Sequence, residues 1–111
     1  MNTSYFAKSS NNFNAVSIAG RAPLWYSGRQ YKKLAPKIGF FKKYKEDGDE
    51  TSFREQYQKQ VLDQLDPQEV YKELGERAVL LCWEKSGDFC HRHLVSEWLM
   101  KHLGITITEI E

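Results

Sequence analysis

Long apolar runs are missing from the sequence, and their absence excludes a helix that spans a membrane. The longest apolar stretch, residues 78–83, is far shorter than the roughly 20 residues that such a helix needs. Residues 1–14 also lack the basic and then apolar order of a secretory signal peptide. We therefore expect a cytoplasmic protein that does not bind membranes.

Cysteine is scarce as well, because Cys82 and Cys90 are the only two in 111 residues. Two cysteines exclude the disulfide-rich scaffolds of small secreted domains. A bond between the two stays open, since a cytoplasmic chain normally keeps its thiols reduced. With 41% hydrophobic and 28% charged residues, and no repeat, the composition is that of one folded domain.

Acidic residues are absent from the first 45 positions, which carry nine basic residues, whereas all 15 acidic residues follow later. The basic part is interleaved with aromatic side chains at Trp25, Tyr26, Tyr31, Phe40, Phe41 and Tyr44. Cations and stacking rings together suit a phosphate-bearing partner, so residues 21–45 are a candidate nucleic-acid-binding segment. The alternative is that the basic and acidic halves attract each other in the fold. We expect nucleic-acid binding to be weak and nonspecific.

The chain divides into a polar N-terminal tail at residues 1–12, which could also be a strand added late, and a single α/β domain at residues 13–111. Apolar alternation predicts a first strand at residues 13–19, followed by a long loop with a turn of helix near residues 30–34. Helical spacing and capping residues predict three helices. The first covers residues 37–45, and the second has about four turns and begins at a capping box of Ser52 and Glu55. The third covers residues 67–74, with Asp66 as N-cap and Gly75 at its end.

The continuous apolar run at residues 78–83 predicts a buried central strand. An amphipathic helix around residues 94–103 ends at Gly104, and residues 105–108 alternate like an edge strand. A strand, a helix and a second strand in this order form a right-handed parallel unit by default.

Reactive side chains are concentrated at residues 80–93, where the buried strand leads into the helix. Ligands of parallel sheets bind beyond the carboxyl ends of the strands, near helix N-termini that favour anions. If Asp88 caps the helix, Cys90 lies in its first turn, where His91 and Arg92 would stabilise a thiolate nucleophile. The alternative is that Cys90 is a small buried hydrophobic residue, and Cys82 is expected in the core.

Arg92 is the predicted anchor for an anion, because a guanidinium grips phosphate or carboxylate through two hydrogen bonds. Arg21, after the first strand, is expected to reach the same rim. The alternative for each is a structural ion pair, for instance with Glu84.

Cys82, Glu84, Cys90, His91 and His93 all belong to residue types that bind zinc. The spacing differs from the short cysteine knuckles of structural zinc sites, and adjacent helical residues point in different directions. We therefore predict no metal site, and nothing in the sequence predicts a cofactor.

The run LLCWEKSGDFCHRHLVSEWL at residues 80–99 resembles the signature of the bacterial and viral proteins in domain-of-unknown-function family 488. Ser17 to Pro23, the Leu34-Ala35-Pro36 triplet and the Phe53 to Tyr57 segment follow the same order as in that family. The resemblance covers roughly residues 13–109. It implies a small three-layer α/β sandwich, with a short, mainly parallel sheet, helices on both faces and the signature residues at the strand ends.

Together these observations predict that the protein binds a small phosphorylated or nucleotide-like anion around residues 82–92, with the oligomeric state left open. The expected ligand-binding residues are Arg21, Trp25, Tyr26, Cys82 and Arg92. The first alternative is a cysteine-dependent hydrolase or transferase in which Cys90 is the nucleophile and Glu84 or His91 moves protons. The second is the nucleic-acid-binding module at residues 21–45.

Overall fold

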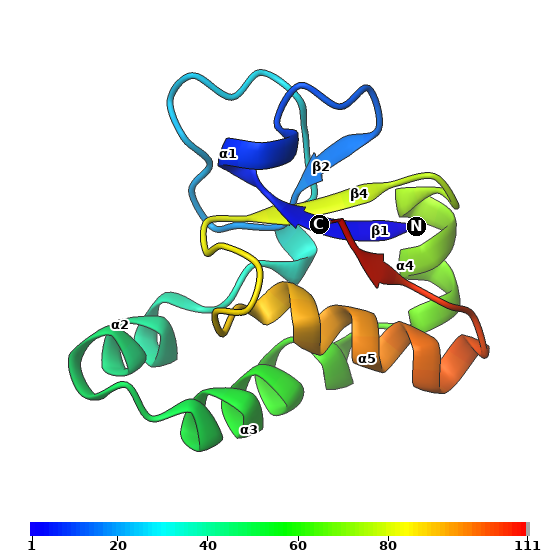
Figure 1. Ribbon diagram of the computed structural model, residues 1–111. Helices are drawn as coiled ribbons and strands as arrows, with labels where there is room; N and C mark the ends of the chain where they lie inside the picture. Colours follow the sequence, from blue (N-terminus) through cyan, green and yellow to red (C-terminus); the bar gives the residue numbers. More distant parts are fainter. Residues whose placement is uncertain (111) are drawn as a thin grey trace.

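A five-stranded, all-parallel sheet forms the centre of the computed structural model, which describes residues 1–110 (Figure 1). The strand order is β3-β2-β4-β1-β5. The strands are β1 (Asn2–Tyr5), β2 (Ala15–Ser17), β3 (Arg29–Gln30), β4 (Val79–Cys82) and β5 (Thr108–Glu109). The α-helices are α1 (Phe6–Ser9), α2 (Ile38–Asp47), α3 (Glu50–Gln60), α4 (Pro67–Leu74) and α5 (His91–Leu103), and 3-10 turns lie at Lys32–Leu34 and Leu62–Gln64.

Strand β4 is the middle of the sheet, and all four of its residues are buried. Leu80 lies opposite Thr3 of β1 on one side and Val16 of β2 on the other. A strand that is covered on both faces needs apolar residues at every position. The central strand predicted from residues 78–83 is therefore confirmed.

Helices cover both faces of the sheet, but unequally. Leu80 belongs to the larger core, which α3, α4 and α5 build on one face. Val79 and Leu81 point to the other face, where they pack with Phe6 of α1 and with Tyr26. Figure 1 shows α1 on one side of the sheet and α5 and α3 on the other. The predicted small α/β fold with a parallel sheet between helices is confirmed, although one face carries only a single helical turn and a loop.

The N-terminal residues do not form the predicted polar tail. Strand β1 lies between β4 and β5, with Thr3 and Ser4 buried. Their hydroxyl groups are paired, because Thr3 Oγ1 donates to Glu109 Oε1 at 2.6 Å and Ser4 Oγ lies 2.7 Å from Ser9 Oγ. Polar side chains can occupy a buried strand when each has a hydrogen-bond partner. The tail interpretation is therefore wrong for residues 2–9, and the alternative of an added strand describes β1.

Other element boundaries differ from the sequence prediction by a few residues. Strand β2 occupies only Ala15–Ser17, and β5 begins at Thr108 rather than at residue 105. Helix α3 begins earlier than the predicted capping box, because Asp49 is its N-cap and accepts a hydrogen bond from the Ser52 backbone N–H at 3.0 Å. The ends of α4 at Asp66 and Gly75 are as predicted. Among residues 1–110, no helix is long and apolar enough to cross a membrane.

Candidate functional site

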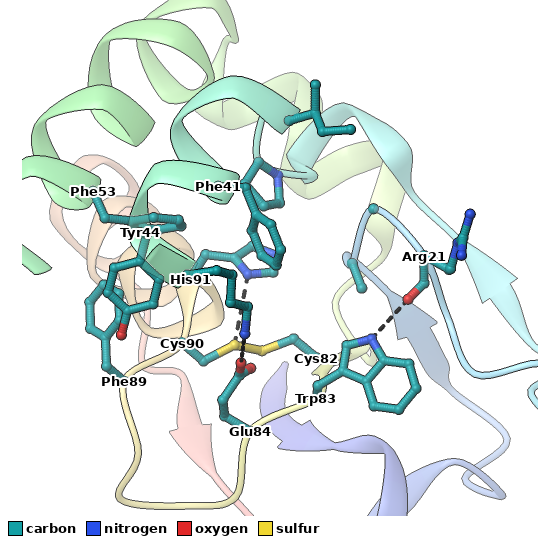
Figure 2. A pocket seen from close by; sticks show the side chains of 15 residues that line it. Arg21, Phe41, Tyr44, Phe53, Cys82, Trp83, Glu84, Phe89, Cys90 and His91 are labelled. Atoms are coloured by element: carbon teal, nitrogen blue, oxygen red, sulfur yellow. Dashed lines mark hydrogen bonds and ion pairs between the residues drawn. A yellow bond between two sulfur atoms is a disulfide. The ribbon is translucent and has the colours of Figure 1, made fainter. Parts of the chain in front are cut away.

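A cavity of about 540 Å³ opens beyond the carboxyl ends of β2 and β4 (Figure 2). Three groups of residues line it: those that follow β2, those between β4 and α5, and one face of α2 and α3. They are Ala19, Gly20, Arg21, Pro36, Ile38, Phe41, Tyr44, Lys45, Phe53, Cys82, Trp83, Glu84, Phe89, Cys90 and His91.

The sheet topology explains why a cavity forms at this position. Strands β2 and β4 are neighbours, but the chain passes from β2 outward to β3 and from β4 past β1 to β5 on the opposite side. The two connections therefore leave adjacent strands in opposite directions and leave a crevice between them. Open α/β sheets bind ligands at such points.

Five aromatic side chains line the cavity, namely Phe41, Tyr44, Phe53, Trp83 and Phe89. Tyr44 and Phe53 pack at 5.2 Å between ring centroids, and Phe89 contacts both rings at 5.5 and 5.4 Å. Trp83 stands on the opposite side in Figure 2. Its side chain remains 53% exposed, and its indole N–H donates to the Arg21 carbonyl oxygen at 2.8 Å, which fixes the ring at the rim.

Three charged groups also line the cavity. Lys45 Nζ lies 3.7 Å from Glu84 Oε1 and 5.2 Å from the centroid of the Phe41 ring. Arg21 lines the rim after β2. Burial, with smaller contributions from Glu50 and Glu84, raises the pKa of Tyr44, so this phenol stays protonated. Two cations and one carboxylate leave the lining with a net positive charge.

Cys82 and Cys90 form a disulfide whose two sulfurs line the cavity, and their Cα atoms lie 7.1 Å apart. The prediction that Cys90 lies in the first turn of a helix capped by Asp88 is wrong. Cys90 is itself the N-cap of α5, with extended backbone and no side-chain cap. Because it is extended, its side chain turns back toward β4 and reaches Cys82.

His91 is buried beside the disulfide and acts as a fixed, neutral group. Its Nε2 lies 2.7 Å from the Ile18 carbonyl oxygen, which can only accept, so Nε2 carries the proton. The other nitrogen, Nδ1, then has a free lone pair and lies 3.7 Å from Cys90 Sγ. Burial lowers the pKa of His91 to about 4, against the raising effect of the Ile18 carbonyl and together with the charge of Arg92.

Arg92 does not line the cavity, contrary to the predicted role as anion anchor. Its side chain is fully buried, and Nε and Nη2 donate to the two carboxylate oxygens of Glu109 at 3.1 and 2.8 Å. Nη1 donates to the Glu84 carbonyl at 2.7 Å and to Cys82 Sγ at 3.1 Å. The ion pair that sequence reasoning offered as the alternative exists, but its carboxylate belongs to Glu109 rather than to Glu84.

Trp25 and Tyr26 also lie away from the cavity. Tyr26 is buried against Phe6, at 5.3 Å between ring centroids, and its hydroxyl donates to the Arg29 carbonyl at 2.8 Å. Trp25 is 62% exposed and does not line the cavity. Neither position therefore supports the predicted ligand contact.

The structure brings together Arg21, Cys82, Glu84, Cys90 and His91 of the predicted site. Sequence reasoning missed Trp83, Phe89 and the wall that α2 contributes through Tyr44 and Lys45. The helical spacing of Phe41 and Tyr44 was visible in the sequence, but it carried no information on which loop that face of the helix would meet.

Comparison with known protein families gives one finding. The sequence profile described as the active DUF488-N3 subclade matches residues 14–103. This range includes β2, α2 to α5 and every residue that lines the cavity. No curated protein and no solved structure matches the chain.

Proposed function

We propose that this chain, which belongs to the DUF488-N3 family, binds a small nucleotide-like anion in the cavity between β2 and β4. The ligand class is a planar, apolar ring system that carries a phosphate or a similar anionic group. The observation that carries the proposal is an aromatic-walled cavity at a topological switch point with two cations in its lining.

The aromatic wall supports the ring part of the ligand. Small-molecule sites are concave and mainly apolar, with a few polar groups that fix orientation. Stacking of a base on an aromatic side chain is worth about 1–3 kcal/mol. Trp83 is held by one hydrogen bond and is 53% exposed, so part of its indole is accessible to a ligand.

The cations support the anionic part. Arg21 and Lys45 come from different elements and both line the cavity. Among residues 1–110, Lys45 Nζ is within 4 Å of one carboxylate, that of Glu84, at 3.7 Å. An incoming phosphate can compete with a contact of this length. These two residues take the place that sequence reasoning gave to Arg92.

Calorimetric titration of the disulfide-bonded protein without added metal tests the proposal. The probes are nucleoside monophosphates, the matching nucleosides and ribose 5-phosphate. A monophosphate should bind tightest, because it alone uses both the aromatic wall and the cations. Lys45→Ala should weaken it about tenfold, which corresponds to about 1.4 kcal/mol.

Lys42→Ala is the matched control, since Lys42 is an exposed lysine of the same helix and does not line the cavity. The Lys42→Ala variant should bind the nucleoside monophosphate with the same affinity as the unchanged protein. Equal affinity for nucleoside and nucleotide would show that the cavity does not recognise the anionic group. If none of the probes binds, the proposed ligand class is wrong.

Cysteine-dependent chemistry is the second candidate function, and a specific contact bears on it. Once the disulfide is reduced, both thiols border the cavity beside His91 Nδ1 and Glu84. In this alternative Cys90 attacks the substrate, and Glu84 or His91 moves the proton. The Arg92 guanidinium contacts Cys82 rather than Cys90, however, so the thiolate is favoured on Cys82.

Alkylation of the reduced protein with iodoacetamide, followed by mass spectrometry of the two cysteine peptides, decides this point. Faster labelling of Cys90 supports a hydrolase or transferase that uses Cys90, and faster labelling of Cys82 opposes it. A cytoplasmic location, which we also propose, would supply the reducing conditions that this chemistry needs.

A further inference from the structure

We propose that the reduced protein binds a thiophilic divalent cation such as Zn²⁺ through Cys82 Sγ, Cys90 Sγ and His91 Nδ1, and that the disulfide is the metal-free, oxidised form of this site. The proposal concerns the inner wall of the cavity. It does not depend on the organic ligand proposed above.

The three donor atoms already converge. They lie within 4.8 Å of one another, all three residues are buried, and Cys90 Sγ is 3.7 Å from His91 Nδ1. Around a tetrahedral zinc with Zn–S of about 2.3 Å and Zn–N of about 2.0 Å, a sulfur and a nitrogen stand roughly 3.5 Å apart. The spacing between Cys90 Sγ and His91 Nδ1 therefore needs almost no change, whereas the two bonded sulfurs separate when the ion binds.

The sequence objection, that adjacent residues of a helix diverge, does not apply here. Cys90 is extended at the N-cap and only His91 is helical, so the two side chains turn toward the same point. The Cα atoms of Cys82 and Cys90 are 7.1 Å apart, whereas disulfides most often span about 4.4–6.8 Å. This backbone spacing leaves room for an ion between two separated sulfurs.

The surroundings are those of a metal ligand set. A histidine that binds a metal usually donates its other ring N–H to a carbonyl or carboxylate, which orients the ring. His91 Nε2 donates in this way to the Ile18 carbonyl oxygen, so Nδ1 presents its lone pair to the sulfurs. Arg92 Nη1 donates to Cys82 Sγ at 3.1 Å, which favours the thiolate that a metal requires.

Two cysteines and one histidine with a fourth position open are a ligand set of catalytic rather than structural zinc sites. All three ligands line the cavity, so the fourth position faces it. Glu84 belongs to the same lining, and its Oε1 lies 3.7 Å from Lys45 Nζ (Figure 2).

The conversion between the two forms balances with a reductant of the phosphine class. The phosphine and one water molecule reduce the sulfur–sulfur bond, giving two thiols and a phosphine oxide. Each thiol then releases one proton as its sulfur binds the cation.

Anaerobic titration of the phosphine-reduced protein with Co²⁺, followed by displacement with Zn²⁺, tests the site. One Co²⁺ per chain should bind, with thiolate charge-transfer absorption and the visible bands of a tetrahedral ion. Cys82→Ser and Cys90→Ser should each lose about half of the thiolate absorption at saturation and weaken binding by more than tenfold. The oxidised protein should bind no Co²⁺.

His93→Gln is the matched control for His91→Gln, because His93 belongs to the same helix but does not line the cavity. Of the two histidine variants, only His91→Gln should weaken Co²⁺ binding. If a variant fails to fold by circular dichroism, the reduced wild-type protein still decides. Three results would each overturn the proposal. The reduced protein could have two titratable thiols but give no Co²⁺ spectrum, the oxidised protein could bind Co²⁺, or the serine variants could bind Co²⁺ as the wild type does. Nucleotide binding by the oxidised protein is measured separately, so the two proposals fail independently.

Discussion

Arg92 shows how a charged residue can be structural in a position where a ligand anchor was expected. A buried guanidinium is stable only when its donors are paired. Here the pairs are the Glu109 carboxylate, the Glu84 carbonyl and Cys82 Sγ, which join β5, the loop after β4 and α5. The sequence shows which reactive residue types are present, but it does not show that the chain brings Glu109 into contact with Arg92.

Arg92→Ala should therefore destabilise the fold by about 3–5 kcal/mol, because it leaves the Glu109 carboxylate largely buried and without its cation. Urea unfolding followed by circular dichroism measures the loss. Arg54→Ala is the control, since Arg54 and Glu97 form an exposed pair at 3.8 Å, and it should change stability by less than about 1 kcal/mol. A stable Arg92→Ala protein that no longer binds nucleotide would restore Arg92 as the anion anchor.

Glu109 gives this ion pair a pH dependence. Burial opposes its charge, but hydrogen bonds from Arg92, Thr3 and Ser86 outweigh burial and hold the pKa at about 2, below its ordinary value of 4.5. A carboxyl group whose pKa is lower in the folded state stabilises the fold above the unfolded-state pKa. This contribution is lost as the pH falls from about 5 toward 2.

Urea unfolding at pH 7 and pH 3 should show a smaller loss of stability in Glu109→Gln than in the wild type, because the variant has no carboxyl group to protonate at this position. The variant should already be less stable at pH 7. Identical pH dependence of the two proteins would mean that the pair with Arg92 does not lower the pKa of Glu109.

At the level of elements, local signals predicted the structure well where they were strong. The unbroken apolar run of β4, the Asp66 cap of α4 and Gly104 at the end of α5 all have local physical causes. Gly104 takes the left-handed conformation, with φ of 67°, which ends a helix at little cost only in glycine. Strand β1 has no such signal, because the hydrogen bonds of Thr3 and Ser4 replace the apolar pattern.

The start of α3 separates the sequence prediction from the structure in a measurable way. Asp49, not Ser52, caps the helix, since the Asp49 carboxylate accepts the Ser52 backbone N–H. Asp49→Ala should cost about 1 kcal/mol of stability, within the 0.5–2 kcal/mol range of lost N-caps. Ser52→Ala should change it by less than half of that. The opposite order, measured by thermal or urea unfolding, would favour the predicted capping box of Ser52 and Glu55.

At the scale of the whole molecule, long-range packing decided which predicted residues share a site. Arg21, Cys82, Glu84, Cys90 and His91 meet because β2 and β4 are neighbours, a pairing that no local pattern specifies. Trp25 lies in the same loop after β2 as Arg21, yet its side chain is exposed to solvent. The α2 wall reaches the cavity only because that helix packs on α3, so its part in the site could not be predicted.

Long-range packing also decides how the charged residues are used, since the basic and acidic halves of the chain meet in the fold. Lys33 pairs with Glu73 at 3.2 Å, and Lys45 pairs with Glu84. The Arg29 guanidinium donates to the carbonyl oxygens of Glu73 and Leu74 at 3.0 Å, near the end of α4. The basic segment at residues 21–45 is thus partly used inside the molecule, which supports the alternative of internal attraction over a nucleic-acid surface.

Binding of single-stranded DNA should therefore be weak and depend on few charges. Among residues 1–110, the side chains of Lys8, Arg21, Lys37 and Lys42 are the cations of the first 45 positions that lack a hydrogen-bonded or ion-pair partner. Single strands lose affinity with salt at a slope of about −0.7 per neutralised phosphate, so these four cations should contribute a slope no steeper than about −3. Fluorescence anisotropy of a labelled oligonucleotide across a salt series measures it.

The double variant Lys37→Ala and Lys42→Ala identifies the residues involved, because both lysines are exposed and lie outside the cavity. If they contact phosphates, the slope should become shallower by up to about 1.4, while nucleotide binding in the cavity stays unchanged. We expect weak binding because the remaining cations are few. Tight binding that resists salt and grows with oligonucleotide length would contradict this and make residues 21–45 a nucleic-acid-binding surface.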